Sequence, residues 1–291
     1  MNRFLAFILA LLVATVTVSS ACTAAQADWI RFTLEPERNG TGQIHASLTK
    51  GASEYDRNQW SSGFPPSELI GLDTSGFRSS GTKPLRFAVV REAGRLNCAG
   101  TGGGSHAWGN CSFTPDAGFM QLLASQGIAR PSREQGLGLM ALNVRRELVQ
   151  AIAAARYPAP TVDQLMALTA VGVNGRYISS MAQAGYRPRS IEGLVEFRAI
   201  GVTPEWIGGF ARIGYGGLPS NELIQLRAMN ITPEFVAGFD SAGYRHLPPS
   251  TLVQLKAMGI TPQFAREAAG GRSALPPVNE LVEMKIFGRR R

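Results

Sequence analysis

The residues best suited to chemistry in this chain are its three histidines and three cysteines. His45, His106 and His246 are far apart, and no His-Glu-x-x-His motif is present, which excludes a metalloprotease of the zincin class. Ser105 and His106 are adjacent, which is not how a Ser-His-acid triad is assembled. We therefore expect no catalytic residue, no cofactor and no metal ligand set, and the chain is predicted not to be an enzyme.

Two of the cysteines bracket a glycine-rich stretch, CAGTGGGSHAWGNC, from Cys98 to Cys111. Two antiparallel strands joined by a loop would bring these cysteines together, and an even pair in an exported chain predicts a disulfide. Closing that loop stabilises the fold by about 3 kcal/mol in the chain-entropy model. The alternative is a metal site made of Cys98, His106 and Cys111, but this spacing matches no standard zinc pattern and offers only three ligands.

The glycines from Gly100 to Gly104 resemble a phosphate-binding loop only superficially. The Gly-Lys-Ser/Thr ending of that motif is absent, and no strand-to-helix context follows. We expect this stretch to be a flexible hairpin loop.

The segment 28–113, which would position these residues, reads as a small antiparallel sheet, either a sandwich or a partial barrel. Alternating or apolar runs bounded by turn residues predict strands. These runs are Trp29–Leu34, Gln43–Leu48, Leu85–Arg91, Arg95–Cys98 and Ala107–Phe113. Between them, the stretch from Gly51 to Gly81 is rich in Ser, Gly and Pro, and a short helical turn is expected only at Pro66–Leu69.

The second half of the chain repeats with a period of 29 residues. Thr-Pro predicts a helix start, because Thr caps the helix and Pro at the first position loses no hydrogen bond. Gly-Tyr predicts a helix end, with Gly in the left-handed conformation. The matching pairs are Thr203-Pro204, Thr232-Pro233 and Thr261-Pro262, and Gly185-Tyr186, Gly214-Tyr215 and Gly243-Tyr244. Each unit is thus a pair of helices that must stack on its neighbours to bury its apolar face.

We expect about six such units over 114–288, the first of them a degenerate copy that begins at Thr114-Pro115-Asp116. The units that start at Asn143 and Gly172 lack Thr-Pro, and we expect the array to be softest there. The predicted fold class is therefore α+β: a small antiparallel β-domain at 28–113, an αα-hairpin solenoid at 114–288, and a basic tail at 289–291.

One column of the repeat is basic: Arg198, Arg227, Lys256 and Lys285 are 29 residues apart on the second helix of successive units. In a solenoid these four residues, the basic ladder, would form a row of positive charge that attracts acidic partners. The alternative is a solvated face that keeps the array soluble.

The N-terminal segment 1–27 has the features of a signal peptide. Arg3 precedes an apolar run, Phe4–Val18, and Ala25-Gln26-Ala27 is a small-x-small cleavage site. Cleavage after Ala27 predicts a periplasmic or secreted protein with a net charge of +7 instead of +8. A lipoprotein anchored at Cys22 is the alternative. No later apolar run reaches about 18 residues, so we expect no membrane span in the mature chain.

The unit cores GVTPEW, NITPEF and GITPQF, each followed by a leucine-rich second helix, resemble repeats of bacterial exported proteins. Similar units occur in the extracytoplasmic tails of membrane metallopeptidases of the BlaR type. The resemblance covers roughly Thr114–Gly288 and implies an extracytoplasmic sensing or interaction role. It does not imply peptidase activity, because the metal-binding motif and membrane helices of those enzymes have no counterpart here.

Three functions are consistent with these patterns. The first is a non-catalytic binding protein of the bacterial envelope, for sensing or scaffolding, whose partner is a protein or an envelope polyanion. Nucleic acid is excluded as a partner by the predicted export. The second is a hydrolase or other enzyme at the junction between the β-domain and the repeats. The third is a purely structural envelope protein.

Overall fold

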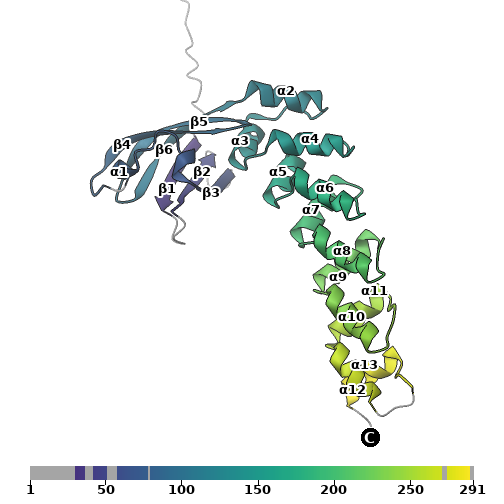
Figure 1. The fold of residues 1–291 in the computed structure, drawn as a ribbon. Coiled ribbons are helices and arrows are strands. Elements are labelled where there is room, and N and C mark those ends of the chain that lie inside the picture. Colours follow the sequence, from purple (N-terminus) through teal and green to yellow (C-terminus); the bar gives the residue numbers. More distant parts are fainter. Residues whose placement is uncertain (1–29, 37–41, 51–57, 78, 271–273, 289–291) are drawn as a thin grey trace, which may run out of the picture.

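A computed structural model describes residues 30–36, 42–50, 58–77, 79–270 and 274–288. Within these ranges an antiparallel sheet is followed by a long array of short helices that leads away from it (Figure 1). The predicted α+β class is confirmed. The predicted signal peptide and basic tail lie outside the described residues. No described helix is long and apolar enough to cross a bilayer.

The sheet has six antiparallel strands in the order β3-β2-β1-β6-β5-β4. Their bounds are β1 Ile30–Pro36, β2 Ile44–Lys50, β3 Asn58–Phe64, β4 Lys83–Arg91, β5 Gly94–Gly103 and β6 His106–Pro115. Side chains alternate between buried and exposed along β1, so one face of the sheet forms the core. That face is strongly curled, because Phe32 on β1 and Phe87 on β4 meet with ring centroids 5.0 Å apart although two strands separate them.

The hairpin β5–β6 places Cys98 directly opposite Cys111. The predicted disulfide joins them, with the two Cα atoms 4.0 Å apart and both side chains buried. The glycine-rich stretch is not the flexible loop that we expected, because β5 continues to Gly103 and only Gly104 and Ser105 form the turn. Both turn residues have positive φ, 61° and 64°, as a tight two-residue hairpin requires.

The structure differs from the sequence prediction in one additional strand and in one boundary. The strand β3 lies in the Ser- and Gly-rich stretch where no strand was expected, and a short 3₁₀ helix, η1 (Pro66–Glu68), follows it as predicted. At the other end, Thr114 and Pro115 extend β6 by pairing with Arg95 and Gly94, and do not start a helix. Asp116 caps the first long helix instead, with its Oδ1 accepting from Phe119 N at 2.7 Å.

A short helix, α1 (Thr74–Phe77), lies between η1 and β4. The array that follows β6 consists of twelve helices in the described part of the chain, and corresponding helices start 29 residues apart. The first helices of the pairs are α2 Ala117–Ser125, α4 Arg146–Ala154, α6 Gly175–Gln183, α8 Pro204–Arg212, α10 Pro233–Ser241 and α12 Pro262–Ala269. The second helices are α3 Arg133–Ala141, α5 Val162–Ala170, α7 Ile191–Ala199, α9 Ser220–Ala228, α11 Pro249–Ala257 and α13 Val278–Phe287. First helices contact first helices and second helices contact second helices, so the pairs stack in two layers.

Helix ends follow the predicted local chemistry. In α10, Thr232 accepts from Phe235 N, and Pro233 occupies the first position. At the other end Gly243 has φ +96°, and Tyr244 N donates to Phe239 O at 2.9 Å, which closes a Schellman motif. The Tyr244 hydroxyl then donates to Pro276 O at 2.8 Å, so this tyrosine ties one pair to the next.

Candidate functional site

Each cation of the basic ladder lies over an aromatic ring on the first helix of its own pair. The rings also recur every 29 residues. From the cation to the ring centroid the distances are 5.3 Å for Arg198 and Tyr177, 5.9 Å for Arg227 and Trp206, 4.9 Å for Lys256 and Phe235, and 5.3 Å for Lys285 and Phe264. Cation–π contacts of this kind stabilise by about 0.5–1 kcal/mol when exposed and more when desolvated. The ladder is thus a periodic cation–π column between paired helices.

Two of these cations, Arg198 and Arg227, also reach the end of the second helix in the preceding pair. Arg227 Nε donates to Ile200 O, at the end of α7, at 3.2 Å. Arg198 lies beside Gly172, which follows α5, with its guanidinium 3.6 Å from where a Cβ would stand. The C-terminal end of a helix carries partial negative charge, which favours a cation there. These two arginines therefore also link successive pairs.

The ladder keeps its positive charge. Within the described ranges, none of its four cations forms an ion pair with a carboxylate. Arg198, Arg227 and Lys256 are half-buried, and Lys285 is exposed. The neighbouring tyrosine does not offset the charge, because burial raises the pKa of Tyr177 to about 12, although Arg198 opposes that shift.

In the second pair, α4 and α5, the ladder is interrupted. The equivalent of the cation is Thr169 and the equivalent of the ring is Leu148, so both partners are replaced together. A hollow of about 220 Å³ lined by Thr169, Leu148 and Asn143 lies there.

A residue of the sheet, Arg91, takes the place of the ladder cation that is absent at Thr169, and it contacts the end of α3, the second helix of the preceding pair. Arg91, the last residue of β4, donates from Nη1 to Met140 O at 3.1 Å and to Ala141 O at 2.6 Å, in the last turn of α3. Its guanidinium lies 4.6 Å from the centroid of the Phe64 ring and 3.0 Å from Glu68 Oε2. Arg91 thus makes the two contacts that Arg227 makes in the ladder: its guanidinium packs on an aromatic ring, and it donates to a carbonyl at a helix C-terminus.

The next residue, Glu92, serves the opposite helix end. Its Oε2 accepts from Arg146 N at 2.6 Å, at the start of α4. The residue in the capping position, Arg145, makes no side-chain cap. A carboxylate at a helix N-terminus is attracted by the partial positive charge there, and a guanidinium at a helix C-terminus by the partial negative charge, so both contacts are stabilising. Two adjacent residues, Arg91 at the end of β4 and Glu92 in the turn that follows, therefore hold the array on the sheet.

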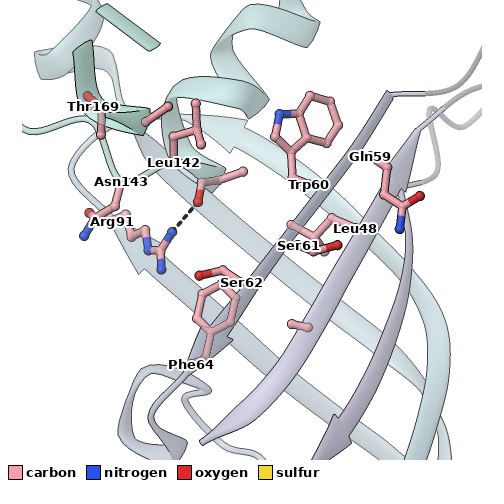
Figure 2. A pocket seen from close by; sticks show the side chains of 13 residues that line it. Leu48, Gln59, Trp60, Ser61, Ser62, Phe64, Arg91, Leu142, Asn143 and Thr169 are labelled. Atoms are coloured by element: carbon pink, nitrogen blue, oxygen red, sulfur yellow. Dashed lines mark hydrogen bonds between the residues drawn. The ribbon is translucent and has the colours of Figure 1, made fainter. Parts of the chain in front are cut away.

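A cavity of about 540 Å³ opens beside this junction. Figure 2 shows Trp60, Ser62 and Phe64 on the sheet side, across from Leu142, Asn143 and Thr169 on the helical side. Its lining also includes Arg91, whose hydrogen bond to the end of α3 is drawn. Within the part of the chain that the structure describes, the lining includes no histidine, cysteine or carboxylate. Its hydroxyl groups therefore have no base among these lining residues.

The histidines lie outside this cavity. His45 is exposed on β2 opposite Glu35, and His106 Nε2 is 4.0 Å from Glu35 Oε1. His246 follows α10 with a positive φ of 50°. Across the described ranges no three His, Cys, Asp or Glu side chains are grouped closely enough to hold a metal ion.

The structure therefore brings together the four ladder residues and their rings, but the junction residues were not foreseen from the sequence. Arg91, Glu92 and Trp60 carry no motif. The one available sign was Arg145, which stands where later units have a capping Thr, so its helix needed a cap from elsewhere. A scan against protein-family models finds no match for this chain, and a search of curated proteins finds no significantly similar sequence.

Proposed function

We propose that this chain is a non-catalytic binding protein of the bacterial envelope whose basic ladder contacts an anionic partner. The observation that carries this proposal is the row of four cations at one position of successive hairpins, none of which forms an ion pair with a carboxylate among the described residues. Because the rings and helix ends hold three of them half-buried, their side chains are pre-positioned and lose little freedom on binding. A single-sign row raises the local concentration of a polyanion.

Export is part of the proposal. Disulfides persist in oxidising compartments and are rare in the cytosol, so the Cys98–Cys111 bond supports a periplasmic or secreted protein. The resemblance of the repeats to extracytoplasmic tails points the same way. We infer that the partner is an envelope polyanion or an acidic protein surface, read by an array that spans from α7 to α13 (Figure 1).

The test compares two variants of equal net charge. One changes Arg198, Arg227, Lys256 and Lys285 to Gln. The control changes four exposed arginines on the first helices or the turns to Gln: Arg189, Arg212, Arg245 and Arg266. The probes are phosphatidylglycerol vesicles and heparin, which represent a lipid and a soluble polyanion.

At low salt the ladder variant should lose about a thousandfold in affinity, since each cation near an anionic surface contributes about 1 kcal/mol. The control should lose far less, and wild-type binding should weaken steeply as added salt shortens the Debye length from about 10 Å to about 3 Å. Circular dichroism should show that both variants stay folded. Equal losses in the two variants would mean that net charge, and not the ladder, determines binding.

A further inference from the structure

The outer edge of β3 is an open strand edge. Among the described residues, β3 pairs only with β2, at one end of the sheet order. Proteins commonly protect such edges with charges, proline or a covering segment. The sequence of β3, NQWSSGF, contains no charged residue and no proline.

The opposite edge of the sheet is protected. The strand β4 carries Lys83, Pro84 and Arg86, and it exchanges two backbone hydrogen bonds between Ala88 and Ile70, each 2.8 Å. The short helix α1 also packs on it. Of the two edge strands, β4 therefore has charged residues, a proline and covering contacts, whereas β3 has none of these among the described residues.

The junction cavity reaches this open edge from the inward face of the sheet. It touches the consecutive residues Gln59, Trp60, Ser61 and Ser62. Trp60 and Ser62 lie on the inward face of the sheet opposite Leu48 and Ala46 of β2, which also line the cavity, whereas Gln59 and Ser61 alternate to the other face. The cavity therefore lies over the inward face of β2 and β3 and, because it touches residues of both faces of β3, extends to the outer edge of that strand. The other wall is formed by the end of α3 and the turn after it, with Ala170 from α5.

We propose that this groove binds an extended peptide segment of a partner protein, which adds a strand to β3. The N–H and C=O groups that β3 directs away from β2, which pair with no other strand in the described ranges, would supply main-chain hydrogen bonds, as in other cases of strand addition. The volume of about 540 Å³ suits a few residues of extended chain. Inward side chains of the added strand would meet Trp60 and Leu142, so small or apolar residues are expected at alternate positions. This site is separate from the basic ladder.

The experiment selects peptides from a phage-displayed library of linear heptapeptides against the full purified chain. The best peptide is then synthesised in two forms, N-methylated at odd or at even positions. In strand addition only alternate residues of the new strand donate to the edge, so one form should bind at least about tenfold more weakly and the other nearly normally. Hydrogen exchange should show protection at residues 58–64.

Trp60→Ala should weaken peptide binding at least about tenfold, because aromatic side chains in such pockets dominate affinity. Trp108→Ala is the matched control, since Trp108 is 53% exposed on β6. The ladder variant should bind the peptide normally, which separates this inference from the proposed function. The inference is overturned if no peptide is enriched, if both N-methylated forms bind alike, if protection lies elsewhere, or if chito-oligosaccharide but no peptide perturbs Trp60 fluorescence.

Discussion

Replacing Arg91 by Met tests whether the sheet is held on the array by a helix-capping cation. The guanidinium donates to Met140 O and Ala141 O, lies over Phe64, and is only 10% exposed. Hydrogen bonds that involve a charged group contribute about 1.5–3 kcal/mol each, and the ring contact about 0.5–1 kcal/mol. The ion pair of Arg91 with Glu68, whose side chain is 43% exposed, adds only about 0–1 kcal/mol because solvent screens it. Against this, Arg91 Nε is buried without a partner in the described part of the chain, which costs about 1–3 kcal/mol.

The balance is a net stabilisation of about 3 kcal/mol by Arg91. Met keeps most of the side-chain volume, so the loss measures the polar contacts and not a cavity. Arg86→Met is the matched control, because Arg86 lies on the same strand but is exposed, and such a change should cost no more than about 0.5 kcal/mol.

The assay is urea unfolding followed by circular dichroism, combined with hydrogen exchange of residues 133–141. Arg91→Met should lower the unfolding free energy by about 3 kcal/mol and speed exchange at the end of α3. If the sheet and the array unfold separately, the exchange rates still report the local effect. Equal unfolding curves and exchange rates for the two variants would refute the capping argument.

Three further predictions follow from the same contacts. Glu92→Ala should remove the cap of α4 and cost about 1 kcal/mol, seen as about fivefold faster exchange at residues 146–154; unchanged exchange would contradict it. Reduction should add two hydrogens to the intact mass, and replacing Cys98 and Cys111 by Ala should lower stability by about 2–4 kcal/mol; free thiols in periplasmic material would refute the bond. Because the folded-state pKa of Tyr177 is raised from 10.0 to about 12, stability should be full below pH 10 and fall as pH rises towards 12. Tyr177→Phe should flatten this loss in urea titrations, and an equally steep loss would exclude Tyr177 as its source.

The repeat architecture could be predicted because its causes are local. Thr232 and Pro233 start a helix, and Gly243 with Tyr244 ends one, through contacts within a few residues of the chain. Repetition at 29 residues then multiplies a weak local preference into a strong pattern. The disulfide was predictable for a similar reason, since a hairpin pairs residues that are close in sequence.

The errors came from local preferences that strand pairing overrode. Thr114 and Pro115 resemble a helix start, but β5 offers them partners and they extend β6. The strand β3 lacks β-branched residues, and pairing with β2 makes it a strand. That the array is softest in the units that start at Asn143 and Gly172 stays a prediction. The contact that sequence reasoning missed there is Glu92, which accepts from Arg146 N although the two residues are 54 positions apart.

The sequence by itself determined the period, the helix ends, the cysteine pair and the row of basic residues, because each depends on spacing along the chain. Only the tertiary structure decided what surrounds those residues. It placed a ring under each ladder cation, brought Arg91 and Glu92 to two helix ends, and left the edge of β3 open beside Trp60. These contacts join segments distant in sequence, and they depend on how the sheet curls and the helices stack, which no local pattern encodes.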